Sequence, residues 1–255
     1  MEDFKTRVAR LAAMLKKANN GVLMTGAGFS TESGLGDFRS PGAAEAAART
    51  YGYPPERILT RDFADRLPEL FWRYYREVFL APAEPNPGHF AAAALEKERR
   101  LSVVTQNCDG LHQRAGSVRV LELHGSIREN RCADCAKYFP EEVVRTDAPV
   151  PRCPACGGTL LPGIVLYDDP LDEGVLRTAK ARMFSADLLI VAGTSLSVYP
   201  AADLPQYYPG RNLVVINRTP TPLDGDAALL FREDTGKVLS AALEVYKTLG
   251  RPAWM

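Results

Sequence analysis

Four of the five cysteines are spaced as the ligands of a metal ion usually are. They are Cys132, Cys135, Cys153 and Cys156, in the pattern C-x2-C-x17-C-x2-C. This spacing is typical of two knuckles that each present two thiolates to one tetrahedral zinc ion. Because sulfur would fill all four positions, the ion would have no place for a catalytic water. We therefore expect a structural zinc.

A pair of disulfides is the alternative use of the same four cysteines. Disulfides persist in oxidising compartments, and a chain sent there usually begins with a charged leader, an apolar stretch and a cleavage site. The sequence shows no such leader. It therefore favours zinc over disulfides and predicts a cytoplasmic protein.

A glycine-rich string, GAGFSTESGLGDFRS at residues 26–40, follows the apolar run 22–25. A strand that leads directly into Gly26, Ala27 and Gly28 has the order found in dinucleotide-binding units. Glycines there would let backbone amides approach a pyrophosphate closely. The motif is incomplete, because Thr31 stands where a third glycine is expected. An ordinary turn is the alternative.

A charged and aromatic triplet, Asp37, Phe38 and Arg39, ends the same string. An aromatic ring between opposite charges could cover a nicotinamide, and the arginine could bind phosphate. A salt bridge within the loop is the alternative.

Polar residues also follow several other apolar runs. Gln106, Asn107 and Asp109 come after the run 102–105, where amide and carboxylate groups could bind ribose hydroxyls and a carboxamide. Asn and Asp also favour plain turns. Two further runs end in the residues Gly193, Thr194, Ser195 and Asn217, and either end could hold a second ribose.

One of the three histidines is a candidate for proton transfer. His124 ends the apolar run before Gly125, so a strand would carry it into a ligand cleft. His89 lies in a turn before a helical pattern, and His112 lies at a helical start. We expect these two to be structural.

The expected elements place these residues in an α/β fold. A helix with Phe4, Val8, Leu11 and Leu15 on one face is predicted to end at residues 19–21. Short strands at 22–25, 102–105, 118–123, 187–192 and 213–217 alternate with helical patterns. This alternation predicts a parallel sheet covered on both faces, which binds ligands at its carboxyl edge. Residues 40–85 and 125–167 do not fit the alternation, and we expect them to form a small domain over that edge.

Composition excludes some other classes of protein. The 255 residues are 46% hydrophobic, which is ample for a buried core. The formal net charge of +0 lacks the electrostatic footprint of a nucleic-acid binder, so we expect no direct nucleic-acid binding. No apolar run approaches the roughly 20 residues of a membrane helix, so we expect no membrane contact.

Taken in order, these strings resemble those of the sirtuins, the NAD-dependent protein lysine deacylases. GAGFSTESGLGDFRS, TQNCDGLH, LELHG, the four cysteines, GTSLSVYPA and VVIN occur in the family's order over nearly the whole chain. The resemblance implies a Rossmann-like, parallel-sheet domain that binds NAD, formed by residues 1–39, 86–124 and 168–255. It also implies a small domain made of a helical module (40–85) and a zinc ribbon (125–167).

The resemblance also implies which residues act. His124 would be the general base, with Asn107 as the second catalytic residue. The NAD phosphates would meet Gly26, Ala27, Gly28 and Ser30, and the nicotinamide side would meet Asp37, Phe38, Arg39, Gln106, Asn107, Cys108 and Asp109. The adenosine half would meet Gly193, Thr194, Ser195, Asn217, Arg218 and Thr235.

The implied reaction moves an acyl group from lysine to ADP-ribose and releases nicotinamide and O-acyl-ADP-ribose. The acyl-lysine protein would bind as an added strand between GIVLYDD and SLSVY. One alternative is mono-ADP-ribosyl transfer or NAD hydrolysis, which would share the nicotinamide-releasing step. Another is a non-catalytic NAD or ADP-ribose sensor whose zinc ribbon docks a protein.

Three positions depart from the family pattern. Gly36 replaces a usual proline, Cys108 replaces a usual isoleucine, and the string with Tyr167, Asp168 and Asp169 replaces a commoner one. The Tyr-x-x-Arg pair of sirtuins that prefer acidic acyl groups is also missing, and Trp72 and Tyr75 occupy the matching places. We therefore predict a preference for acetyl or apolar acyl groups over succinyl.

Overall fold

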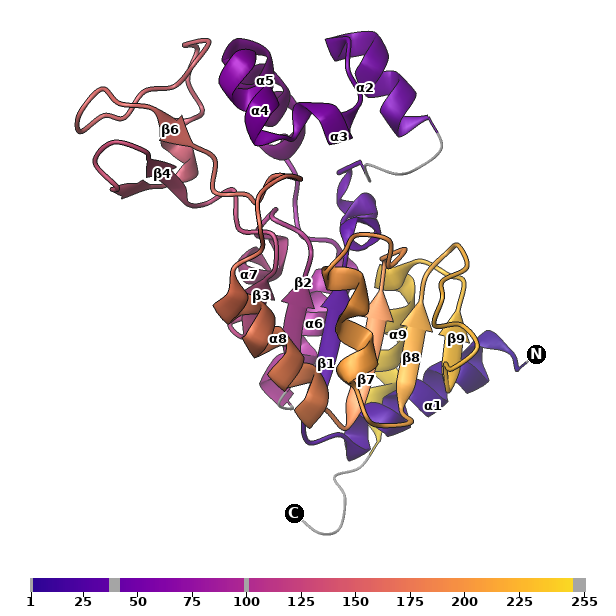
Figure 1. The fold of residues 1–255 in the computed structure, drawn as a ribbon. Coiled ribbons are helices and arrows are strands. Elements are labelled where there is room, and N and C mark those ends of the chain that lie inside the picture. The colour runs from indigo at the N-terminus through magenta and orange to yellow at the C-terminus, as the bar shows by residue number, and fades with distance from the viewer. Residues whose placement is uncertain (1, 37–41, 99–100, 250–255) are drawn as a thin grey trace.

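Six parallel strands form the central sheet of the computed structural model, which describes residues 2–36, 42–98 and 101–249. The strands are β1 (Gly21–Thr25), β2 (Ser102–Thr105), β3 (Val120–Glu122), β7 (Leu188–Ala192), β8 (Leu213–Ile216) and β9 (Leu229–Phe231). Their order is β3-β2-β1-β7-β8-β9. Because all the pairings are parallel, the carboxyl ends of the strands meet at one edge (Figure 1).

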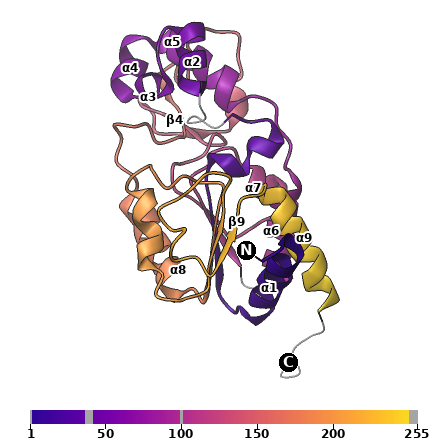
Figure 2. The same ribbon diagram turned by 90° about the vertical axis from the view of Figure 1, so that its right-hand side faces the viewer.

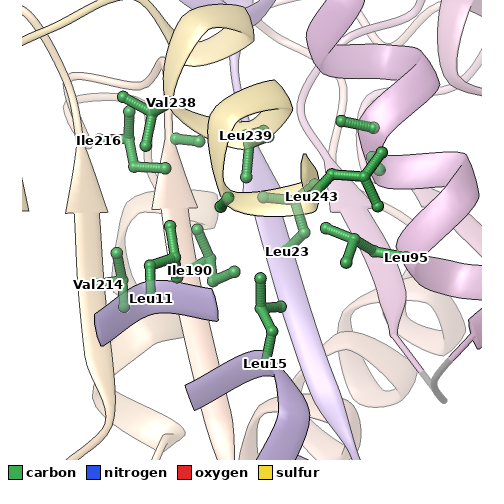
Figure 3. Close-up of a cluster of buried hydrophobic side chains, with 14 of the residues drawn as sticks. Leu11, Leu15, Leu23, Leu95, Ile190, Val214, Ile216, Val238, Leu239 and Leu243 are labelled. Atoms are coloured by element: carbon green, nitrogen blue, oxygen red, sulfur yellow. The ribbon is translucent and has the colours of Figure 1, made fainter. Parts of the chain in front are cut away.

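Helices cover both faces of this sheet (Figure 2). One face packs against α1 (Phe4–Lys17), α6 (Pro87–Glu98) and α9 (Thr235–Thr248), and Figure 3 shows this core with Leu23, Ile190 and Val214 from the strands. The other face packs against α8 (Glu173–Ser185) and the 3₁₀ helix η5 (Ala201–Tyr207). Burial on both faces explains why the strands are apolar throughout.

Short helices follow β1 and β2 at the carboxyl edge of the sheet. The 3₁₀ helices η1 (Ala27–Phe29) and η2 (Thr31–Ser33) come after β1, and α7 (Leu111–Arg114) comes after β2. At the start of the chain, Asp3 caps α1 by accepting the Thr6 amide at 2.8 Å, and the helical pattern from Phe4 is confirmed.

A second group of elements lies beyond the carboxyl ends of the strands (Figure 1). Its helical part comprises α2 (Ala43–Tyr51), α3 (Pro55–Ile58), α4 (Arg61–Arg66), α5 (Pro68–Tyr74) and a π-helical turn, η3 (Tyr75–Phe79). Its ribbon part is an antiparallel sheet of β4 (Asn130–Cys132), β5 (Tyr138–Phe139) and β6 (Leu160–Leu161), with the 3₁₀ helix η4 (Glu141–Val143). Phe71 and Tyr75 share one core with Cys132 and Leu160, so the two parts pack together.

The predicted fold class is therefore confirmed. The five predicted strands are present with bounds within two residues of those expected, and β9 was not predicted. The run 118–123 yields only Val120–Glu122, and Leu123 already lies in a turn. The boundaries proposed for the two domains stay a prediction. Among the described residues, no helix is long and apolar enough to cross a membrane.

Candidate active site

A cavity of about 780 Å³ opens where the strand ends face the second group of elements. The predicted site residues that line it are Ala27, Gly28, Ser30, Gln106, Asn107, Cys108, Asp109, His124, Gly193, Thr194, Ser195, Asn217, Arg218 and Thr235. Gly26 lies directly beside this lining. Asp37, Phe38 and Arg39 lie outside the described residues. The structure thus brings together residues that follow each of the six strands.

The glycines of the first loop are required by the protein itself. A Cβ added at Gly26 would lie 2.8 Å from the Cβ of Thr194, and one added at Gly28 would lie 2.9 Å from the carbonyl oxygen of Gly193. Gly193 has a φ of +63°, and a Cβ there would lie 2.3 Å from the Phe29 amide nitrogen. The loops after β1 and β7 therefore pack backbone to backbone. These glycines are needed for packing as well as for the close approach to a ligand that the sequence suggested.

A polar network fixes the loop after β2. Ser30 Oγ donates to Asp109 Oδ2 at 2.6 Å and accepts from Asn107 Nδ2 at 3.0 Å. Asp109 Oδ1 also accepts the Leu111 amide at 2.9 Å. Burial raises the pKa of Asp109, although these hydrogen bonds oppose the shift. The side chains are held before any ligand arrives, as a binding site requires.

His124 lines the cavity, and a hydrogen bond to the backbone sets the tautomer of its ring. Its Nδ1 lies 3.0 Å from the carbonyl oxygen of Gln106, which can only accept, so Nδ1 carries the proton. In the neutral form of the ring the lone pair therefore lies on Nε2, which is the basic atom. The His124 carbonyl accepts the Val165 amide at 2.9 Å and the Cys108 thiol at 3.2 Å, so its backbone is anchored as well.

The other two histidines lie in the interior beneath the glycine loop. His89 and His112 have rings 4.8 Å apart, and each lies about 5 Å from the Phe29 ring. Both are essentially unexposed. Neither lines the cavity. This is the structural placement that we expected.

Sequence reasoning missed Glu32, which closes the far end of the site. Its carboxylate accepts the Gly236 amide at 2.7 Å and the Thr235 hydroxyl at 3.2 Å, at the start of α9. Nearby, Arg218 pairs with Asp234. About 200 residues separate Glu32 from α9, and no local spacing signals such a contact.

An apolar wall faces the polar residues across the cavity, and sequence reasoning missed it too. Its members include Leu59, Val78, Phe79, Ile164 and Leu166, from the helical part and from the segment after the ribbon. Such residues are indistinguishable in sequence from core residues, so no signal marked them. Trp72 and Tyr75, which the sequence had placed near the acyl group, lie in the core and do not line the cavity.

The four ribbon cysteines fit a zinc ion. Their Sγ atoms all lie within 4.8 Å of one another, with Cys132 to Cys156 at 3.6 Å and Cys135 to Cys153 at 3.7 Å. Zinc–sulfur bonds of about 2.3 Å at tetrahedral angles give sulfur separations of about 3.8 Å. A disulfide needs about 2.05 Å. The donor set therefore suits a closed, structural zinc site.

Comparison with known proteins identifies the family. The model of the Sir2 family matches residues 26–200. This chain belongs to the Sir2 family. It is 43% identical over 241 residues to the NAD-dependent protein deacetylase of Clostridium perfringens, covering 93% of this chain and 99% of that one.

Two solved Sir2 structures show the same fold. A Sir2 protein bound to acetylated peptide is 35% identical, with a TM-score of 0.80 over 91% of this chain and 95% of that one. A mutant Sir2 homologue in complex with 2′-O-acetyl ADP ribose is 36% identical, with a TM-score of 0.85 over 94% of this chain and 96% of that one.

Proposed function

We propose that this protein is an NAD-dependent protein lysine deacetylase that passes the acetyl group from lysine to ADP-ribose and releases nicotinamide. The observation that carries the proposal is His124, whose basic Nε2 belongs to a ring lining a cavity shared by dinucleotide-type loops and an apolar wall. The names of the family members support the same activity.

We assign both halves of NAD to the cavity. We assign the phosphates to the loop of Gly26, Ala27, Gly28 and Ser30, beside the start of η1. Gln106, Asn107 and Asp109 would hold the nicotinamide ribose and amide. Gly193, Thr194, Ser195, Asn217, Arg218 and Thr235 would hold the adenosine half. Asp37, Phe38 and Arg39 keep their assignment to the nicotinamide side as a sequence-based prediction.

The residues around His124 supply proton transfer and exclusion of water. Bound NAD would supply a ribose carbon that exchanges its bond to nicotinamide for one to the acyl oxygen, and one water would later release the free lysine and leave the acetyl group on the ribose. His124 Nε2 then takes the proton of a ribose hydroxyl, which makes that oxygen nucleophilic toward the acyl carbon. Asn107, held by Ser30, keeps the ribose oriented, and the apolar wall limits bulk water.

The acyl-lysine peptide would bind as an added strand. Residues 164–167 form one side of the cavity, and Ser195, Val198 and Tyr199 form the other. A peptide laid between them would be held by main-chain hydrogen bonds. The absence of nucleic-acid binding and a cytoplasmic location remain predictions from the sequence.

The charge distribution in the cavity supports acetyl over succinyl. Among the described residues that line it, the only arginine or lysine is Arg218, which belongs to the adenosine end and pairs with Asp234. Leu59, Val78 and Ile164 offer no charge to a second carboxylate. A buried carboxylate without a partner is costly, so the succinyl group is disfavoured.

The test compares wild type with two variants, using NAD with acetylated and succinylated forms of one peptide. His124→Ala and His124→Gln should each lower turnover about 10²- to 10⁴-fold, because neither supplies a base. Gln retains an amide that can donate to the Gln106 carbonyl, so it controls for loss of local structure. Calorimetry should show that NAD binding persists in both variants.

Mass spectrometry of the products decides between activities. Wild type should yield nicotinamide, the deacetylated peptide and O-acetyl-ADP-ribose, and should act faster on the acetyl than on the succinyl peptide. Free ADP-ribose with no peptide consumed would indicate NAD hydrolysis, and an ADP-ribosylated protein would indicate transferase activity. NAD binding with no turnover at all would indicate a sensor.

A further inference from the structure

A short segment bridges the sheet and the helical part of the molecule along one side of the cavity. We call residues 164–169 the wall segment. At its start, Ile164 forms an antiparallel bridge with Gly125, and the Val165 amide donates to the His124 carbonyl at 2.9 Å. Further along, the Tyr167 amide donates to the Leu59 carbonyl at 2.8 Å. The wall segment is therefore attached at both ends.

Two aspartates make the attachment to the helical part. Asp168 Oδ1 accepts the Arg61 amide at 2.7 Å, at the beginning of α4. Asp169 pairs with the Arg61 guanidinium, with Nη2 to Oδ2 at 2.6 Å and Nε to Oδ1 at 3.4 Å. This two-point contact fixes orientation as well as distance. The side chains of Arg61 and Asp169 are largely shielded, at 31% and 27% exposure.

The same carboxylate also holds the backbone of the wall segment. Asp169 Oδ2 accepts the Leu166 amide at 3.3 Å, and the Asp169 amide donates to the Leu166 carbonyl at 3.1 Å. Leu166, its neighbours Ile164 and Tyr167, and Asp169 itself line the cavity. One side chain thus links Arg61 of α4 to the residues that would face an incoming peptide.

We propose that Asp169 is a positioning residue, which through its ion pair with Arg61 holds the wall segment ready for an acyl-lysine peptide. The inference rests on the proposed function, because it concerns how that substrate binds. A wall segment that is already fixed loses little conformational freedom when a peptide pairs with it. Without the ion pair, the wall segment would have to become ordered when the peptide binds, and that ordering would weaken the observed binding.

The expected effect is a change in the KM for the peptide alone. Asp169→Asn and Arg61→Gln should each raise the KM for an acetylated peptide about five- to tenfold, as expected for a shielded, charge-assisted pair. The loops that would hold NAD and the bond from His124 to Gln106 involve neither residue. The KM for NAD and kcat should therefore stay near their wild-type values.

The matched control is the neighbouring ion pair on the same helix. Arg66 pairs with Asp62 at 2.8 Å, and their side chains are 76% and 64% exposed. Arg66→Gln removes an ion pair from α4 without touching the wall segment, so it should leave the KM for peptide unchanged. The double variant of Arg61→Gln and Asp169→Asn should be no worse than Asp169→Asn alone, because that single substitution already removes the ion pair.

Steady-state kinetics with NAD, and binding of a fluorescent acetylated peptide to the protein without NAD, together decide the outcome. The inference is overturned if the KM for peptide does not rise, if kcat and both KM values worsen together, or if the two substitutions act independently in the double variant. A wild type that binds no acetylated peptide overturns the proposed function itself. A wild type that binds it as tightly as every variant overturns only the role of Asp169.

Discussion

Cys108 is placed to affect inhibition by nicotinamide, a product of the proposed reaction, although it takes no part in that reaction. The residue lines the cavity between Asn107 and Asp109, and its thiol donates to the His124 carbonyl at 3.2 Å. Burial is the main cause that raises the pKa of this thiol, so it stays protonated and is a poor nucleophile. We therefore expect Cys108 to affect the site through the size of its side chain.

We predict that nicotinamide inhibits the wild type more weakly than it inhibits Cys108→Ile. The larger side chain adds apolar contact with the ring, and the difference in inhibition constant should be about three- to tenfold. Titration of nicotinamide against deacetylation measures it. Cys108→Ser, which has nearly the size of the wild type, should keep the wild-type constant. Equal constants for the wild type and Cys108→Ile would reject the explanation by size.

At the scale of elements, the loop after β1 rests on an uncharged pair of histidines. The His89 ring accepts the Asn86 amide at 3.2 Å, and His112 Nε2 lies 3.1 Å from Thr25 Oγ1. Burial lowers the pKa of His89 to about 4, and burial with the neighbouring His89 lowers the pKa of His112 to about 3. Both rings are therefore neutral in the folded protein near pH 7.

We predict that stability falls as the pH drops below about 6.5, the ordinary pKa of histidine in an unfolded chain. Between that pH and about 4, the unfolded chain binds protons that the folded protein does not, so unfolding becomes easier as pH falls. Each such histidine contributes a slope of about 1.4 kcal/mol per pH unit. Urea unfolding at several pH values measures this slope.

The matched variant is His89→Gln, which removes one titrating ring. Its free energy of unfolding should depend less steeply on pH between about 4 and 6.5, while wild type and variant should show equal pH dependence above about pH 7. Indistinguishable slopes in the acid range would show that His89 is not held neutral in the folded protein.

The sequence predicted the elements of the site better than their mutual contacts. Residues such as Asn107, His124 and Asn217 could be assigned because each follows an apolar run, and parallel strands bring such positions to one edge. The contact of Glu32 with α9 could not be assigned, because it joins residues far apart in sequence. The ion pair between Arg61 and Asp169 was missed for the same reason.

At the scale of the whole molecule, the arrangement of the hydrophobic cores predicts that a zinc ion in the ribbon supports one side of the cavity from a distance. The sheet has its own two cores, one on each face, which use none of the ribbon cysteines. The core beyond the strand ends combines Cys132, Cys153 and Leu160 of the ribbon with Phe71 and Tyr75 of the helical part. The same core includes the start of the wall segment.

We predict that removing zinc disrupts this third core and leaves the sheet folded. Strong chelation, or Cys156→Ser, should abolish deacetylation, because the wall segment and the apolar side of the cavity lose their support. Hydrogen exchange should rise in the ribbon, in α4 and α5 and in residues 164–169, whereas β1, β2 and β7 should keep their protection.

Cys108→Ser is the control, since it removes a cysteine outside the metal cluster and should keep both zinc and exchange protection. Uniform loss of protection in sheet and ribbon would mean that the two regions unfold as one cooperative unit. Full activity after complete loss of zinc would show that the ribbon does not support the cavity. The predicted pattern follows from the packing, because one core contains both the knuckle residues Cys132 and Cys153 and side chains such as Ile164 and Leu166 that line the cavity.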